Sequence, residues 1–310
     1  MIPAPLRRHR LIKLVISAFP ALRYTEVRFN KTGKLIGDLK DAWVRQYFCE
    51  AEFEPEFFEI ASPLIPDCGV FFDVGANFGF CTFGLFGARK ERQIRYFLFE
   101  ANPIVFECLK KSADLNAWGS FHLERGCVLD KAGFSSLRFN LNHTGGGYYA
   151  GPNPSGTPNI VLDEFIRENG IGTVDLLKMD IEGSEPLALE GAKASLSRGI
   201  IKAVYLELST ENLRRQGRVP NESIDPLREA GFNLFWCKPE DFAKSSNLSE
   251  FSVKVRSERG SFTVSRFKSF PDNYQTDILA LHQDTPLMNK LKECFNSGSS
   301  NGAGIREVSI

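Results

Sequence analysis

The chain of 310 residues has no excess of charge of either sign, because 38 lysines and arginines are balanced by 38 aspartates and glutamates. A protein without net charge has no long-range field to attract a polyanion, so nucleic acid is not expected as a partner. A small or neutral substrate fits this composition better. With 43% hydrophobic residues, the chain can bury one large core and carry extensions.

The sequence also lacks a CxxC pair and any cluster of cysteine and histidine with the spacing of metal ligands. Its seven cysteines are scattered and odd in number. This usage favours reduced thiols, most of them in the core, and predicts a cytoplasmic protein.

No apolar run is long enough to span a membrane. The segment RRHRLIKLVISAFPAL, at residues 7–22, combines basic and apolar residues, but Lys13 and Pro20 interrupt it. No cleavage site of small residues follows, so a signal peptide is not favoured. The segment is interpreted as a helix that docks on the domain, or as a basic amphipathic segment that rests on an anionic membrane surface.

A turn that resembles a dinucleotide-binding turn lacks its middle glycine. In GVFFDVGANFG, at residues 69–79, an apolar strand leads to Asp73 and a sharp turn at Gly75, and Gly79 permits the next helix to pack on the sheet. The GxGxxG pattern needs its middle glycine for the approach of a pyrophosphate, and Asn77 stands there instead. This favours S-adenosylmethionine, which has no diphosphate, bound near free amides at the helix start. A turn without any ligand is the alternative.

Acidic residues stand at the ends of three predicted strands, which cover residues 95–100, 174–179 and 203–208. The acids are Glu100, Asp180, Glu182 and Glu207. Since the carboxyl ends of parallel strands meet at one edge of a sheet, we expect these acids to face a common cleft. Glu100 is expected to accept hydrogen bonds from ribose hydroxyls, with a helix-capping role as its alternative.

The predicted organisation has three parts: an N-terminal helical and aromatic extension at 1–66, a Rossmann-like domain at 67–285, and a flexible tail at 286–310. Residues 37–60 predict a helix whose aromatic side chains belong to the core. Residues 143–158 hold too many glycines and prolines for helix or strand and predict a loop, either a substrate lid or a loosely ordered surface loop. An insert at about 240–272 predicts a hairpin with solvated strands.

Several motifs occur in a fixed order between about residues 37 and 281. They are DVGANFG (73–79), FEANP (99–103), LDEF (162–165), DLLKMDIEGSE (175–185), a leucine, alanine and glycine helix through 191–192, and YLEL (205–208). On these motifs, the chain resembles the FkbM family of S-adenosylmethionine-dependent methyltransferases. It departs from the family at Ala101, where many relatives have proline, and at Leu208, where relatives often have histidine. The second difference argues against a histidine proton relay.

The resemblance implies an α/β class I methyltransferase fold, with a doubly wound, mostly parallel sheet and an antiparallel last strand. It implies that the methionine end of the cofactor lies near the glycine turn and the ribose near Glu100. The expected cofactor-binding residues are Asp73, Gly75, Ala76, Asn77, Gly79, Glu100, Ala101, Asn102 and Asp180.

The expected reaction is methylation of a hydroxyl group on a sugar, a polyketide or another small molecule. Asp180 and Glu182 are the leading candidates for the base that removes the hydroxyl proton, and Glu207 is the third. A divalent cation held by these carboxylates is not favoured, because acids at strand ends more often hold ligand hydroxyls or cap helices.

Two other functions remain open from the residues alone. An NAD-dependent oxidoreductase would need room for a pyrophosphate, which Asn77 opposes. A noncatalytic module that binds a nucleoside or a protein would keep the glycine turn without needing the acids. The sequence predicts neither the acceptor nor the oligomeric state.

Overall fold

The computed structural model describes residues 4–89, 93–140, 143–237, 252–258, 260–296 and 306–309. Its first elements are α1 (Ala4–Ala18), the 3-10 helix η1 (Pro20–Leu22), β1 (Tyr24–Phe29), β2 (Gly33–Asp38), α2 (Ala42–Glu50), α3 (Pro55–Leu64), β3 (Val70–Val74), α4 (Phe80–Ala88), β4 (Arg95–Glu100), α5 (Pro103–Leu115), β5 (Ser120–Arg125), β6 (Cys127–Val128), β7 (Phe134–Asn140), β8 (His143–Pro152) and β9 (Thr157–Ile160). Then follow α6 (Leu162–Glu168), β10 (Leu176–Met179), α7 (Glu185–Glu190), α8 (Lys193–Ser197), β11 (Ala203–Ser209), α9 (Thr210–Arg215), α10 (Pro220–Ser223), α11 (Asp225–Glu229), β12 (Phe232–Trp236), β13 (Ser252–Ser257), β14 (Gly260–Arg266), β15 (Gln275–His282), α13 (Pro286–Asn296) and β16 (Arg306–Ser309).

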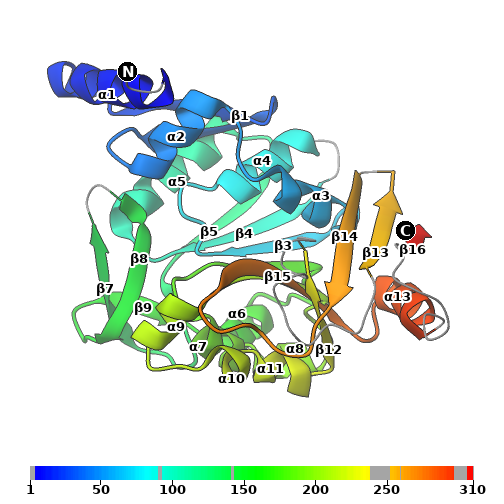
Figure 1. Ribbon diagram of the computed structural model, residues 1–310. Coiled ribbons are helices and arrows are strands. Elements are labelled where there is room, and N and C mark those ends of the chain that lie inside the picture. Colours follow the sequence, from blue (N-terminus) through cyan, green and yellow to red (C-terminus); the bar gives the residue numbers. More distant parts are fainter. Residues whose placement is uncertain are drawn as a thin grey trace.

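A ten-stranded sheet with the order β16-β13-β14-β12-β15-β11-β10-β3-β4-β5 forms the centre of the molecule (Figure 1). From β5 to β11 every neighbouring pair is parallel. Strand β15 runs antiparallel to both of its neighbours, β11 and β12. The sheet therefore confirms the predicted mostly parallel arrangement with an antiparallel last strand.

Two helical layers cover the sheet, as Figure 1 shows, with α3, α4 and α5 on one face and α6 to α11 on the other. Alternate residues of β3 point into these two layers, because successive side chains of a strand face opposite sides. The ring of Phe71 lies 6.2 Å from that of Phe57 in α3, whereas the ring of Phe72 lies 6.0 Å from that of Phe165 in α6. The apolar run that predicted a strand buried on both faces thus separates two cores.

The N-terminal extension is more elaborate than predicted. Residues 37–60 contain two helices, α2 and α3, rather than one. They are separated by Ala51, whose φ of 56° ends α2, and by Glu54, whose φ is 28°. Before them, β1 and β2 form a hairpin that the sequence did not predict, with positive φ angles at Asn30 and Lys31 in its turn.

Helix α1 docks on the domain, in agreement with one of the two interpretations of this segment. Its Ile16 is buried in the core, and Ile12 packs against that core. Among the described helices, none is long and apolar enough to cross a membrane.

Residues 143–158, predicted to be a loop, largely form strands. Strand β8 pairs antiparallel with β7 over irregular register, and β9 pairs with β7 and β6. The pairing supplies backbone hydrogen bonds that offset the weak strand preference of glycine, and the register shifts accommodate the irregular backbone. Figure 1 shows β7 and β8 as an arm beside the sheet.

In the described part of the predicted flexible tail, residues 286–296 form a helix and residues 306–309 form a strand. Helix α13 buries Leu287, Met288 and Leu291, and β16 pairs parallel with β13. The predicted hairpin of the insert is present as β13 and β14, but Val253 and Val264 on its inner face are fully buried. Residues 238–251 of the insert and 297–305 of the tail lie outside the described part of the chain.

The start of α2 provides a test of how the extension is held. Both bonds that cap this helix go to Asp41 Oδ1, which accepts from Trp43 N at 2.9 Å and Val44 N at 3.1 Å. We expect Asp41→Ala to lower the free energy of unfolding by about 1–2 kcal/mol and Asp41→Asn to lower it less, because asparagine also caps helices. Urea denaturation of the three proteins measures this difference. Equal midpoints for wild type and Asp41→Ala would contradict it.

Candidate active site

The glycine turn after β3 is fixed between two neighbouring strands. Gly75 has a φ of +72°, and a Cβ atom there would lie 1.9 Å from the carbonyl oxygen of Asp180, so only glycine fits. The amides of Gly75 and Ala76 both donate to Phe99 O at 3.0 Å. The amide of Asn77 donates to Glu100 Oε2 at 2.8 Å. The turn amides expected to be free for a ligand are therefore used to hold the turn.

Glu100 closes β4 and joins the turn to the next helix. Its Oε2 accepts from Asn77 N, and its Oε1 accepts from Asn102 N at 2.7 Å. Burial raises the pKa of Glu100, and these backbone amides oppose that shift by stabilising the carboxylate. A carboxylate offers about four acceptor positions and three backbone amides bond to this one, so it can still accept a bond from a ligand hydroxyl.

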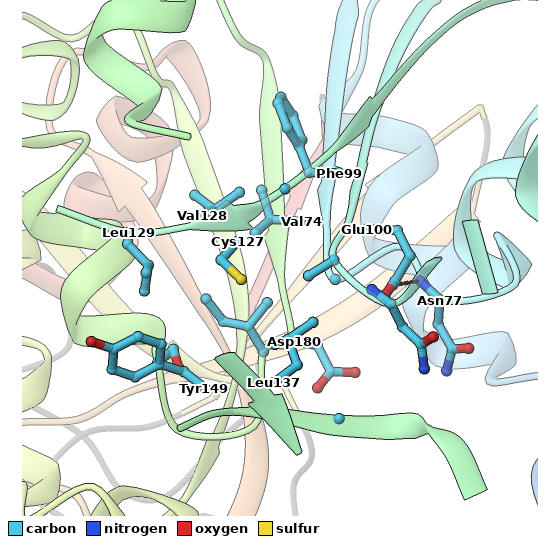
Figure 2. Close-up of a pocket in the computed structure, with 17 residues that line it drawn as sticks. Val74, Asn77, Phe99, Glu100, Cys127, Val128, Leu129, Leu137, Tyr149 and Asp180 are labelled. Carbon is cyan, nitrogen blue, oxygen red and sulfur yellow. Dashed lines mark hydrogen bonds between the residues drawn. The ribbon is translucent and has the colours of Figure 1, made fainter. Parts of the chain in front are cut away.

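A first cavity opens beside Glu100, and we name it the glutamate cavity. It is lined by Val74, Gly75, Asn77, Phe99, Glu100, Ala101, Asn102, Gly126, Cys127, Val128, Leu129, Leu137, Gly147, Tyr149, Asp180, Ile181 and Ser184. Figure 2 shows Asn77 and Glu100 together on one side of this cavity, with Leu129 and Tyr149 on the other. One end is thus polar and the other offers apolar and aromatic surface.

A second cavity adjoins the first, and we name it the aromatic cavity. It is lined by Trp43, Val44, Tyr47, Phe53, Glu54, Gly75, Ala76, Asn77, Phe78, Phe80, Cys81, Gly146, Lys178, Asp180, Glu182, Glu207, Asn212 and Gln275. Its aromatic wall comes largely from the N-terminal extension, which also supplies Glu54, while Asp180, Glu182 and Glu207 come from the ends of strands. The two cavities share Gly75, Asn77 and Asp180.

A buried lysine connects the turn with the acids. Lys178 Nζ donates to Gly75 O at 3.0 Å and lies 3.5 Å from Asp73 Oδ1 and 3.7 Å from Asp180 Oδ2. Burial would lower the pKa of Lys178, but the charges of Asp73 and Asp180 outweigh it and raise the pKa above its ordinary value. The ammonium group therefore stays charged and compensates two carboxylates.

Glu207 and Asp180 form a hydrogen-bonded pair of carboxyl groups at the aromatic cavity. Burial, the charge of Asp180 and the hydrogen bond to Asp180 raise the pKa of Glu207, while Gln275, whose Nε2 donates to Glu207 Oε1 at 2.5 Å, opposes the shift. Two carboxyl groups in contact cannot both ionise easily, so the pair shares one proton near neutral pH. The raised pKa places that proton on Glu207.

Glu182 enters the same cavity from the turn after β10. Its backbone has a φ of 56°, and its Oε2 accepts from Asn212 Nδ2 at 2.7 Å. The structure thus brings all three predicted catalytic acids, Asp180, Glu182 and Glu207, to the aromatic cavity.

The predicted cofactor residues fall into two groups. Those that line the glutamate cavity are Gly75, Asn77, Glu100, Ala101, Asn102 and Asp180, and Ala76 lines the aromatic cavity. Asp73 and Gly79 line neither cavity. Asp73 is fully buried beneath the turn, where its Oδ2 accepts from Thr82 Oγ1 at 2.7 Å, and Gly79 lies against the ring of Phe83.

Sequence reasoning missed several lining residues. Lys178 could have been found, because a charged residue within the apolar run LLKM needs a buried partner. Leu137 carried no such signal, whereas Tyr149 belongs to the segment predicted as either a substrate lid or a surface loop.

Two buried polar atoms of the glutamate cavity suit a nucleoside ligand. Within the described chain, Ser184 Oγ and Asn77 Oδ1 have no hydrogen-bond partner. A buried polar atom without a partner is costly unless a ligand or water satisfies it. Glu100 can accept bonds from a ribose, and the apolar end of the cavity can hold an adenine. With the two unpartnered atoms, these groups fit S-adenosylmethionine. No group of three or more potential metal ligands occurs among the residues that the structure describes.

Comparison with known families decides the assignment. A profile described as "Methyltransferase FkbM domain" matches residues 73–234, more than half of the chain. The chain belongs to the FkbM methyltransferase family. The family is one of S-adenosylmethionine-dependent methyltransferases, and the matched region includes both Glu100 and the acids of the aromatic cavity.

Similar solved structures include the methyltransferase FkbM from Methylobacillus flagellatus KT, with 17% identity, a TM-score of 0.40, and coverage of 84% of this chain and 60% of that one. Precorrin-6y C5,15-methyltransferase from Geobacter metallireducens GS-15 has 12% identity and a TM-score of 0.37, covering 72% and 86%. Aeropyrum pernix fibrillarin with natively bound S-adenosyl-L-methionine has 11% identity and a TM-score of 0.36, covering 66% and 68%. These values are too low to carry an argument about ligands. A search of curated proteins found no match for this chain.

Glu185, the first residue of α7, provides a pH-dependent test of the packing beside the site. Burial raises its pKa from 4.5 to about 7, although Ile181 N donates to its Oε1 at 2.9 Å. The folded state holds this proton more tightly than the unfolded chain does, so stability falls as pH rises from about 4.5 to about 7.

We therefore expect Glu185→Gln to raise the free energy of unfolding at pH 8 by on the order of 2 kcal/mol and to change it little at pH 4.5. Urea denaturation at both pH values measures the effect, with the exposed Glu190→Gln on the same helix as the control. If Glu185→Gln changed the free energy of unfolding equally at both pH values, the raised pKa of Glu185 would be contradicted.

Proposed function

We propose that this FkbM methyltransferase methylates a hydroxyl group of a small molecule or glycan, with the cofactor's adenosine in the glutamate cavity and the acceptor in the aromatic cavity. The observation that carries the proposal is the meeting of the two cavities at Gly75, Asn77 and Asp180. A transferred group must lie where donor and acceptor sites join, and an acid stands at that junction.

When bound, S-adenosylmethionine supplies a methyl group on a sulfonium, which an oxygen nucleophile can attack. The chain's own contribution is then to align the acceptor and to take its proton. Asp180 stands where the two cavities meet and serves as the base. Protonated Glu207 donates a hydrogen bond to Asp180 and fixes its orientation.

The lining of the aromatic cavity supports a polyhydroxylated acceptor such as a sugar or a polyketide. Glu182, Asn212 and Gln275 offer hydrogen-bonding groups to this cavity, and Trp43 and Tyr47 offer it flat apolar faces. Sugars present hydroxyl groups at their edges and apolar C–H surfaces on their faces, and this combination matches such a lining.

We also propose that the protein acts in the cytoplasm with reduced thiols. The six cysteines whose side chains the structure describes are free, and burial raises the pKa of Cys127, in the glutamate cavity, to about 12. A thiol of this kind stays protonated and is part of the cavity wall rather than a nucleophile.

Cofactor binding is tested by calorimetric titration with S-adenosylmethionine, S-adenosylhomocysteine and NAD. We expect the first two to bind and Glu100→Gln to weaken them roughly tenfold to hundredfold, because the amide replaces a charged acceptor of ribose hydroxyls. The control is Glu107→Gln, an exposed residue on the following helix. Folding of both variants is verified by thermal denaturation. Binding of NAD in place of S-adenosylmethionine would contradict the assignment. Equal affinities of Glu100→Gln and Glu107→Gln for S-adenosylmethionine would also contradict it.

Catalysis is tested by release of S-adenosylhomocysteine in the presence of a panel of free sugars, nucleotide sugars and hydroxylated polyketides. With the acceptor that gives turnover, we expect Asp180→Asn to lower kcat by about 10² to 10⁴. We expect Glu207→Gln to lower kcat by less than about tenfold, because glutamine mimics a protonated acid. Exposed Glu190→Gln is the control. If Glu207→Gln were as damaging as Asp180→Asn, Glu207 would be the base.

A further inference from the structure

Helix α1 carries two apolar stripes, and only one of them is covered. Ile12 and Ile16 are spaced four residues apart and face the domain. Leu11, Leu14 and Val15, at the i, i+3 and i+4 positions of a second stripe, are exposed by 61%, 68% and 37%. A helix that needed only to dock on its domain would have polar residues on this outer side.

The exposed stripe continues beyond the helix. Phe19 is 63% exposed and Leu22, in η1, is 50% exposed. Figure 1 shows α1 at the periphery of the molecule, beside α2 and away from the central sheet. The exposed residues together form a surface that we name the α1 patch, and its members are Leu11, Leu14, Val15, Ala18, Phe19 and Leu22.

Basic residues flank the α1 patch, and α1 itself contains no acidic residue. Arg8, Arg10 and Lys13 are exposed on α1. At 3.6 residues per turn, Arg8 lies on one side of the stripe, and Arg10 and Lys13 lie on the other. The first acidic residue of the chain is Glu26. Such a local excess of positive charge stands out in a protein whose net charge is zero.

We propose that the α1 patch binds peripherally to an anionic lipid bilayer. Apolar side chains in the centre of the surface would enter the boundary between headgroups and acyl chains, while the basic residues on both sides would meet anionic headgroups. The charge complementarity favours this occupant over a second copy of the chain, because two copies would bring like charges together. Helix α1 packs on α2, which carries Trp43 and Tyr47 into the aromatic cavity. If the proposed function holds, membrane binding therefore brings the acceptor site near the bilayer.

Vesicle sedimentation of the full chain tests the proposal. We expect cosedimentation with vesicles of phosphatidylcholine and phosphatidylglycerol in equal parts, weaker binding as sodium chloride is raised, and little binding to phosphatidylcholine alone. Leu11→Ser with Leu14→Ser, and separately Arg10→Glu with Lys13→Glu, should each weaken binding roughly tenfold or more. The matched controls are Val219→Ser, which removes an equally apolar exposed residue elsewhere, and Arg198→Glu, which reverses an exposed charge elsewhere.

Thermal denaturation verifies that the patch variants are folded, and binding of S-adenosylhomocysteine verifies that their cofactor site is intact. No binding to the anionic vesicles, equal binding to both kinds of vesicle, or unchanged binding by the patch variants would overturn the proposal. Sedimentation velocity without lipid gives a further outcome. A dimer that the two leucine substitutions dissociate, without vesicle binding, would identify the patch as a self-association surface and overturn the membrane assignment.

Discussion

The charge balance at Lys178 is the interaction on which the site depends. One ammonium group, buried at the carboxyl edge of the sheet, lies within 3.0 Å of Gly75 O and within 4 Å of the carboxylates of Asp73 and Asp180. It thereby connects β10 to the turn that follows β3. A buried charge of this kind is tolerated only because its partners compensate it. The turn after β3 and Asp180 at the cavity junction are therefore both needed to compensate the charge of Lys178.

This requirement explains a division of roles among the acids at the strand ends. Asp73 is fully buried and stabilises the lysine from beneath the turn, whereas Asp180 reaches both cavities. Glu207, farther along the sheet edge, has a raised pKa because of its burial and, after that, because of the charge of Asp180. Carboxyl groups at neighbouring strand ends thus have different roles, set by their burial and by the charges near them.

Much of the sheet could be predicted from the sequence, because buried parallel strands are continuous apolar runs and their acids stand at fixed positions after them. Glu100, Asp180, Glu182 and Glu207 were placed at the site for this reason. The pairing of segments distant in sequence was harder to predict. Strand β8 is rich in glycine and forms only against β7, and α13 has apolar residues at helical spacing beside a stretch of glycine and serine that suggested disorder. Tyr149 and Trp43 were not placed at a cavity because their positions depend on such contacts.

The place of β15 in the sheet has a consequence for synthesis of the chain. This strand lies between β11 and β12, although it follows both of them in sequence. A nascent chain that has emerged only as far as β12 therefore has an unpaired hydrogen-bonding edge on β11, with its apolar faces already formed. The central sheet closes only when residues 275–282 leave the ribosome and insert between two strands that are already present. Folding of this protein is thus completed from its C-terminal side, and β11 gains its second neighbour only after β15 is made.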